Sequence, residues 1–259
     1  MKGLFLQLPG EFSDASIQKL WRDRVINDGT VYCYDALDYF SYAKQAAPSA
    51  GVDVWKDLKE EAAGAAFTGT VGFDNGFTFT NGSGGGITLP AAGVFPADAD
   101  GFCTAIWFVT PPPVTGLIKL FGANTAYTDA NCQYAIVVPV GATGVYKAYF
   151  GGFAPSNSVF TDPEGGTLLQ IGLAAKKKPN GKYNIMVFRN GAKVAQSEST
   201  FDSLPQPADV PKISGGTTHA ADKVLRVWAD DCSIHTADEL IELDYAANHA
   251  RLAVAVGGS

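Results

Sequence analysis

The residues whose types could carry chemistry in this chain are three histidines, four cysteines and two acid pairs. His219, His235 and His249 are far apart and match no metal or nucleophile pattern. Asp230-Asp231 follows an apolar strand and could offer a metal two carboxylates, but this position favours one turn cap and one exposed acid. No GxSxG nucleophile elbow is present. We therefore expect no metal site, no cofactor and no catalytic residues.

The cysteines are scattered along the chain, with no CxxC pair and no neighbouring histidine, so a zinc site is not expected. They are Cys33, Cys103, Cys132 and Cys232. Cys103 and Cys232 lie within predicted apolar strands and should be buried thiols. In a reducing compartment we expect no disulfide.

Composition limits the class of partner. The chain has 259 residues, 46% of them hydrophobic, and a formal net charge of -7. Nucleic acid is not expected as a partner, because phosphate contacts need a basic face. The short apolar run at residues 4–8 stops at Pro9, which is too short for a secretory signal, and no stretch is long enough to span a bilayer. These features predict a soluble chain made in a cytoplasm, with no membrane partner.

The elements that position these residues are predicted to be strands. From Phe67 onward, short apolar runs alternate with turn signals such as Asn75-Gly76 and Asn190-Gly191. The spacing predicts a buried strand over 101–110 and antiparallel pairs of 133–140 with 144–152 and of 167–175 with 182–190. Many short strands in this order predict an all-β sandwich of two antiparallel sheets.

The N-terminal residues differ from the rest. Residues 1–30 are predicted to form an arm with a strand and a short helix over 15–25, and residues 31–259 to form the sandwich. Ile17, Leu20 and Trp21 share one face of that helix and are the candidate assembly contacts. The arm either packs on the sandwich or docks the protein onto an assembly. One or two helical turns are also expected over Lys56–Ala63.

A closing helix is predicted after the last strand. Thr236 is the expected N-cap, and Glu239 completes a capping box. Leu240, Leu243 and Ala247 have the spacing of one buried face.

A series of short motifs follows in a particular order along residues 31–250. In chain order they are Tyr34-Asp35-Ala36, Ser41-Tyr42, Val54–Leu58, Phe73–Gly76, Ile87–Pro90, Ala105–Val109, Leu120–Gly122, Val187–Gly191, Val224–Trp228 and Ile234–Leu240. This order resembles the concanavalin A-like lectin/glucanase superfamily, specifically the laminin-G-like jelly-roll domains of phage virion proteins. The resemblance implies a jelly-roll sandwich. The segment 59–64 departs from the turn usual there, so no calcium or ligand loop is expected at that place.

The same resemblance bears on catalysis. Glucanases of this fold carry three acids on one strand, which places their carboxylates on one face of a cleft. Glu242 and Asp244 are the nearest match here, but the third acid is missing and the segment is predicted to be helical. Residues two apart on a helix do not face the same way. We therefore expect these acids on the solvated face of the closing helix, and a protein that is not an enzyme.

Sugar recognition is the alternative use of such a domain. Amides and carboxylates bind sugar hydroxyls and aromatic rings stack on sugar faces. The loop 124–133 contains these groups, and the candidate ligand-binding residues are Asn124, Tyr127, Asp129 and Asn131.

The functional expectation follows from the resemblance and the arm. The chain is expected to be a structural component of a phage particle, such as a capsid decoration, baseplate or tail protein. It would contact other virion proteins, form a homo-oligomer and reside in the virion. The alternative is a carbohydrate-binding module that recognises host surface glycans.

Overall fold

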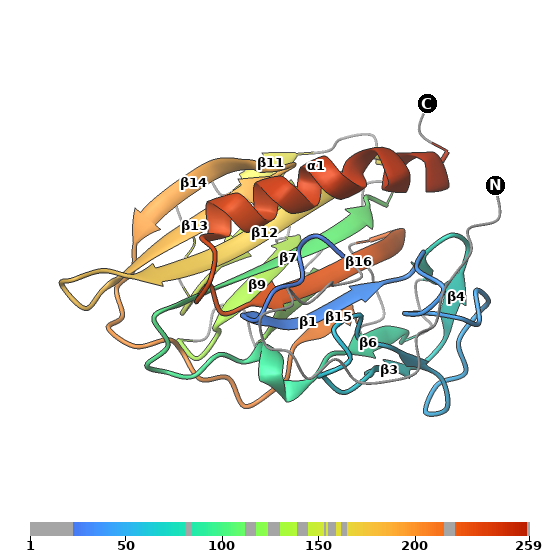
Figure 1. Ribbon diagram of the computed structural model, residues 1–259, viewed down its shortest axis with the longest axis horizontal. Coiled ribbons are helices and arrows are strands. Elements are labelled where there is room, and N and C mark those ends of the chain that lie inside the picture. The colour runs from blue at the N-terminus through green and yellow to red at the C-terminus, as the bar shows by residue number, and fades with distance from the viewer. Residues whose placement is uncertain are drawn as a thin grey trace, which may run out of the picture.

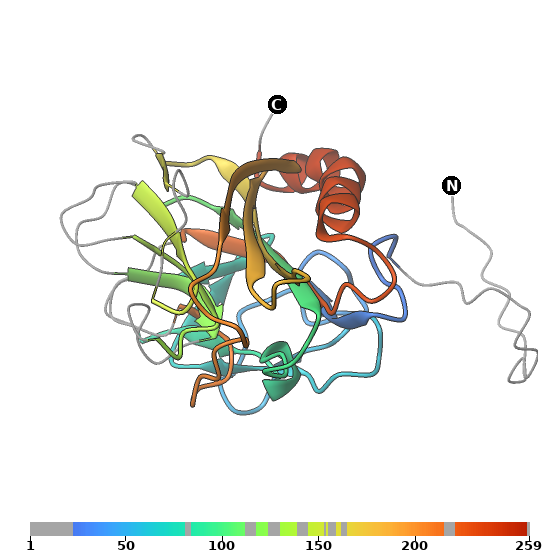
Figure 2. The same cartoon turned by 90° about the vertical axis from the view of Figure 1, so that its left-hand side faces the viewer.

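The structure is a computed structural model that describes residues 23–80, 84–111, 118–123, 130–138, 145–152, 154, 159–161, 165–214 and 221–257. Within them, antiparallel strands form two sheets that face each other as a sandwich (Figures 1 and 2). This confirms the predicted all-β class with a C-terminal helix.

One sheet, which we call the helix-covered sheet, carries α1 (Ala237–Ala255) on its outer face (Figure 1). In the described residues its strand order is β14 (Ala192–Glu198), β13 (Tyr183–Arg189), β12 (Leu168–Lys177), β7 (Gly101–Val109), β16 (Lys223–Asp230), β5 (Phe77–Phe79) and β4 (Val71–Phe73), and β1 (Thr30–Asp35) also pairs with β16. Every residue of β7 and β16 is buried. These two strands lie between the opposite sheet and α1, which explains why buried and exposed residues do not alternate along them.

The other sheet, the open sheet, contains β11 (Val159–Thr161), β10 (Val145–Tyr149), β9 (Tyr134–Val138), β8 (Ile118–Ala123), β15 (Lys212–Ser214), β6 (Gly86–Thr88), β3 (Ala65–Thr68) and β2 (Val54–Trp55) in that order. A short 3-10 helix, Ala91–Gly93, follows β6. Burial alternates along β10, as expected for a strand with one solvated face. The predicted pairs are confirmed, since β9 pairs with β10 and β12 with β13.

Aromatic rings fill part of the core between the two sheets. The Phe77 ring lies 4.8 Å from the rings of Tyr42, Trp55 and Phe67, measured between centroids. Several of these contacts are edge-on or tilted, the arrangement that aromatic rings prefer. The core therefore brings strands of both sheets together through a few large side chains.

The closing helix begins as predicted. The Thr236 hydroxyl accepts a hydrogen bond from the Glu239 N–H, and the Glu239 carboxylate accepts one from the Thr236 N–H at 2.8 Å, which completes the capping box. The helix lies close to β12, because a Cβ added at Gly172 would lie only 2.6 Å from Ile241 Cδ1. Glycine at this position allows α1 to approach the sheet.

The predicted buried face of α1 is wrong. Leu240 is buried, but Leu243 and Ala247 are exposed. The buried positions are instead Ala237, Leu240, Ile241, Asp244, Asn248 and Leu252. Two of these side chains are polar: Asn248 donates to Asp244 within the helix, and Asp244 has partners on the sheet from distant parts of the chain.

Asp244 is the centre of this polar contact, so the expectation that it is solvated is also wrong. Its Oδ2 accepts hydrogen bonds from Trp107 Nε1 at 2.6 Å and Gln170 Nε2 at 2.7 Å. Its Oδ1 accepts one from Arg226 Nε at 2.9 Å. Asp244 is fully buried. A buried carboxylate is tolerated here because every one of these groups donates to it.

Arg226 is also fully buried, and it contacts two further carboxylates. Its terminal nitrogens lie 3.1 Å from Asp35 Oδ2 and 2.9 Å from Asp23 Oδ1. Asp35 is paired in addition with Arg251 of α1. This network, which we call the Arg226 cluster, joins β16, β1, α1 and the segment before β1.

At two places the described residues are not helical where a helix was expected. Asp23–Val25, the end of the predicted arm helix, form a bend and a turn, because the Asp23 side chain accepts from the Val25 N–H and pairs with Arg226. The remainder of the arm, with Ile17, Leu20 and Trp21, lies outside the described residues.

The segment 56–63 forms turns in place of the expected helix. Its Asp57 carboxylate accepts hydrogen bonds from the N–H groups of Cys33, Lys59, Glu61 and Ala62. A carboxylate that binds nearby N–H groups competes with helical hydrogen bonding. In the part of the chain that the structure describes, no helix has the length and apolar character needed to cross a bilayer.

Replacing Asp244 by Ala should lower the free energy of unfolding by about 3–5 kcal/mol, because it leaves Arg226 buried with one carboxylate fewer and leaves Trp107 Nε1 without its partner. Urea unfolding followed by circular dichroism measures the change. Glu242→Ala is the matched control, since Glu242 is an exposed acid on the same helix. A change below about 1 kcal/mol in Asp244→Ala would contradict this account of the helix contact.

The Arg226 cluster also predicts a response to acid. Burial raises the pKa of Asp35, but Arg226 and Arg251 outweigh it and hold that pKa below its usual range. The unfolded chain therefore binds the proton more readily, and this contribution to stability is lost as the pH falls below about 4. Unfolding measured from neutral to acidic pH should lose less stability in Asp35→Asn than in the unaltered chain. Asp222→Asn, at an exposed carboxyl, should leave the profile unchanged.

Candidate functional site

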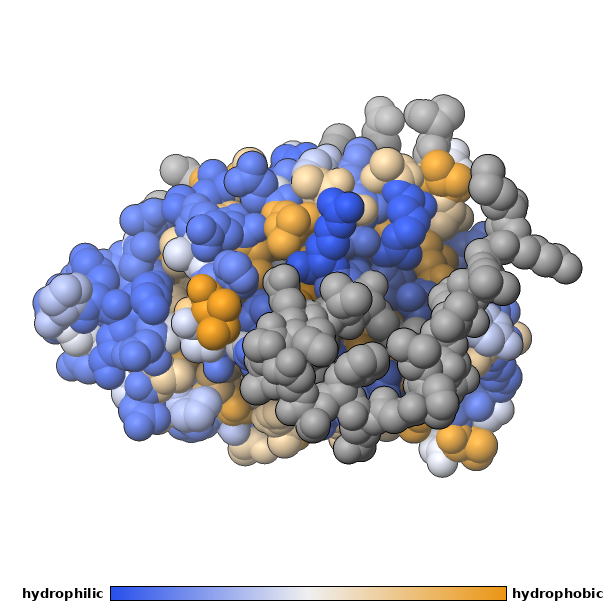
Figure 3. All heavy atoms as spheres, viewed as in Figure 1, coloured by the Kyte–Doolittle hydropathy of each residue, from blue (hydrophilic) through white to orange (hydrophobic). Residues whose placement is uncertain are grey.

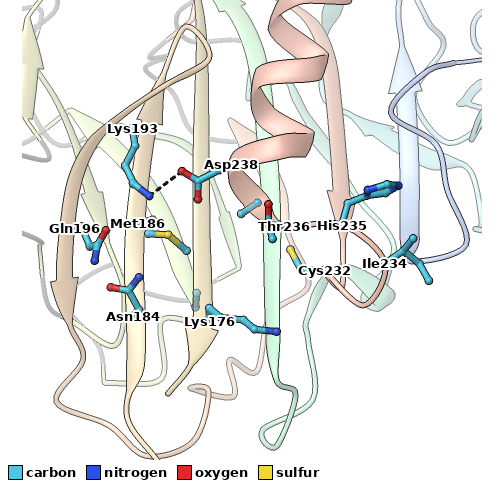
Figure 4. Close-up of a pocket in the computed structure, with 12 residues that line it drawn as sticks. Lys176, Asn184, Met186, Lys193, Gln196, Cys232, Ile234, His235, Thr236 and Asp238 are labelled. Carbon is cyan, nitrogen blue, oxygen red and sulfur yellow. Dashed lines mark hydrogen bonds and ion pairs between the residues drawn. The ribbon is translucent and has the colours of Figure 1, made fainter. Parts of the chain in front are cut away.

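A groove of ≈ 480 Å³ lies on the outer face of the helix-covered sheet, beside the start of α1 (Figure 4). It is lined by Ala175, Lys176, Asn184, Met186, Lys193, Gln196, Cys232, Ile234, His235, Thr236, Ala237 and Asp238. Figure 3 shows hydrophilic residues gathered over the end of the molecule that α1 leaves uncovered in Figure 1. The groove is thus a hollow with a mixed polar and apolar lining at the edge of the helix contact.

Strand residues form one wall of the groove. Asn184 and Met186 are two apart on β13 and share its outer face, as the strand period requires. Lys193 and Gln196 on β14 are three apart, yet both line the groove. The pairing of β13 with β14 shifts register at Val187/Phe188, and this bulge lets both side chains face outward.

The other wall is the segment that enters α1. Lys193 Nζ lies 2.7 Å from Asp238 Oδ1, so one ion pair joins the two walls (Figure 4). Both side chains are partly exposed, and such a pair contributes little to stability. In Figure 4 the imidazole of His235 is directed away from the sheet wall. The groups that line the groove are therefore amides, ammonium groups, the Asp238 carboxylate and the apolar side chains of Met186 and Ile234.

Three side chains of metal-ligating type lie close together beside the groove, and one of them, Cys232, lines it. The ligand atoms of Cys103, Asp230 and Cys232 are all within 4.8 Å of one another. Cys103 is buried as predicted, but Cys232 follows β16 and is only half-buried. Burial, and then the hydrogen bond to Cys232, raise the pKa of the Cys103 thiol well above its ordinary value. Sequence spacing gives no sign of this cluster, because β7 and β16 bring distant residues together.

The two consecutive acids behave as expected. Asp230 Oδ1 accepts a hydrogen bond from the Cys232 N–H at 2.7 Å and so caps the turn after β16. Asp231 is exposed.

The predicted sugar-binding loop is not tested by the structure. Asn124, Tyr127 and Asp129 lie outside the described residues. Asn131 is exposed in a turn before β9, on the open sheet. Gln133, at the end of the same loop, is buried and exchanges two hydrogen bonds of 2.8 Å with the backbone of Phe95. The loop therefore contributes at least one structural side chain, and no groove residue was among the predicted site residues.

Comparison with known proteins gives structural relatives. No protein-family model matches the sequence, and no curated protein matches it. Among solved structures, the Trypanosoma rangeli sialidase matches with a TM-score of 0.58 and 16% identity over 88% of this chain and 34% of the sialidase chain. This chain thus spans about a third of the sialidase chain.

Two further matches cover a larger share of the other chain. Domain 4 of AbnA, a GH43 extracellular arabinanase from Geobacillus stearothermophilus solved in complex with arabinotriose, matches with a TM-score of 0.51 and 16% identity over 83% of this chain and 97% of that domain. The receptor binding domain of a botulinum neurotoxin C/D mosaic serotype matches with a TM-score of 0.53 and 11% identity over 86% of this chain and 52% of the other. At these identities the likeness establishes a shared β-sandwich fold.

The expectation that this protein is not an enzyme is contradicted by these matches, because a sialidase and an arabinanase are enzymes. The expectation relied on a missing acid in one linear pattern. Groups that meet in this fold, such as Cys103 and Cys232, lie far apart in the sequence. A search for one short sequence pattern therefore cannot detect groups of catalytic residues that the sandwich brings together from distant parts of the chain.

The start of α1 shapes one wall of the groove, so its cap can be tested directly. Thr236→Ala should lower the free energy of unfolding by about 1 kcal/mol, because the N–H of Glu239 loses its acceptor. Thermal and urea unfolding measure the loss. Thr200→Ala, at an exposed threonine outside the groove, should change stability by less than about 0.5 kcal/mol. Equal effects of the two changes would rule out the cap as a stabilising contact.

Proposed function

We propose that this chain is a glycan-binding sandwich and that the groove beside α1 binds an oligosaccharide. The observation that carries the proposal is the groove itself, a hollow of ≈ 480 Å³ on a sheet face whose lining combines amides and ammonium groups with apolar side chains. The fold supports it, since nearly the whole of an arabinanase domain that was solved with arabinotriose matches this chain.

The groove side chains suit a ligand rich in hydroxyl groups. A sugar hydroxyl both donates and accepts hydrogen bonds, and the amides of Asn184 and Gln196 do the same. Lys176 supplies a further donor at one end. Met186 offers an apolar surface to the carbon-bound hydrogens of a sugar ring. Because these residues lie on paired strands, the sheet fixes the spacing of their backbone positions before any ligand binds.

Calorimetric titration of the purified chain tests the proposal, with arabinotriose and a sialic acid-terminated oligosaccharide in the panel. We expect saturable binding to at least one oligosaccharide. Asn184→Ala and Gln196→Ala should each weaken it about tenfold, the effect of losing one hydrogen bond of roughly 1.4 kcal/mol.

Asn180→Ala is the matched control, since Asn180 is an exposed amide at the hairpin tip between β12 and β13 and is not among the groove-lining residues. Binding that is equally weakened by Asn180→Ala would show that the groove is not the site. The absence of saturable binding across the panel would overturn the glycan proposal.

The expected role in a phage particle rests on the sequence resemblance, and no family match supports it. Location in a virion, contact with other virion proteins and self-association through Ile17, Leu20 and Trp21 stay predictions. A sugar-binding groove is compatible with recognition of host surface glycans, which would be its use in such a particle.

A further inference from the structure

We propose that Cys103, Asp230 and Cys232 form a binding site for a divalent metal ion of the zinc class. The two sulfur atoms and a carboxylate oxygen lie within 4.8 Å of one another, close enough to share one ion after a small adjustment. The site is separate from the groove amides, and it goes beyond the proposed sugar binding.

The sheet and the turn bring the three groups together. Cys103 on β7 and Asp230 on β16 are direct partners in the antiparallel register. After Asp230 the chain turns, and Cys232 has a φ of 55°, in the left-handed region that residues other than glycine rarely adopt. The turn places the Cys232 thiol beside the Cys103 thiol.

Charge provides the second argument. Asp230 is fully buried, and its oxygens accept hydrogen bonds from neutral groups, namely Asn27 Nδ2 at 2.8 Å, the Thr30 hydroxyl at 3.0 Å and the Cys232 N–H at 2.7 Å. Among the residues that the structure describes, no cationic side chain pairs with it. Asp244, which is also fully buried, has Arg226 as its ion-pair partner. A bound cation would give Asp230 the positive partner that it lacks.

The donor set indicates the class of metal. Two thiolates with one carboxylate suit zinc and similar borderline ions, whereas calcium and magnesium prefer oxygen ligands alone. Each thiol loses its proton to solvent when the metal–sulfur bond forms. Cys232 is half-exposed and lines the groove, so an ion can enter from that side and a water molecule can complete its coordination.

Cobalt(II) titration of the reduced, chelator-treated chain tests the site. We expect one equivalent to bind with the near-ultraviolet charge-transfer absorption of a cobalt–thiolate bond, and zinc to displace it. Cys232→Ser should remove at least about half of this absorption and weaken zinc binding by at least about tenfold. Cys132→Ser is the matched control, because Cys132 is a buried thiol in a different part of the core.

A measurement on the unaltered chain avoids any loss of folding in the variants. Alkylation followed by mass spectrometry should label Cys232 when zinc is absent and leave it protected when zinc is present. The proposal is wrong if no cobalt–thiolate absorption forms, if Cys232→Ser retains it in full, or if zinc fails to protect Cys232. None of these readouts involves a sugar, so failure of the metal site is distinguishable from failure of glycan binding.

Discussion

The buried guanidinium of Arg226 constrains more of this structure than any single apolar contact described above. It lies on a strand that is buried throughout, and it contacts the carboxylates of Asp23, Asp35 and Asp244. Such a group is stable inside a protein only when its charge and its N–H groups are satisfied. The segment before β1, the strand β1 and the helix α1 therefore each hold the position that supplies a carboxylate. The rotation of α1, and with it the place of Asp238 at the groove, follows from this requirement.

The sheets were predictable from sequence because their signals are local. Apolar runs, Asn-Gly turns and the capping box at Thr236 each depend on a few neighbouring residues, and the structure confirms them. The face of α1 was not predictable in the same way. Leu243 and Ala247 have the apolar spacing of a buried face, but Asp244 finds partners at Trp107, Gln170 and Arg226 that no local pattern reveals. Hydrogen bonds to these distant polar partners, and not the spacing of apolar residues, determine which face of α1 is buried.

The candidate site escaped prediction for a related reason. Recognition residues were predicted in a polar loop, whereas the groove is formed by outward-facing residues of strands and by the segment that enters a helix. Asn184 and Gln196 look like ordinary solvated residues of an alternating strand. Their convergence depends on the bulge between β13 and β14 and on where α1 stops covering the sheet. Neither property can be read from composition or spacing.

The place of β16 within the helix-covered sheet has a consequence for synthesis. It is the last strand in chain order, yet it lies between β7 on one side and β5 and β1 on the other. As the chain leaves the ribosome, β7, β5 and β1 each have an unpaired edge and exposed apolar side chains until β16 is synthesised. Contacts across such long separations form slowly, and open strand edges invite pairing with other molecules. We therefore expect the nascent chain to depend on chaperones that bind extended apolar segments until β16 inserts.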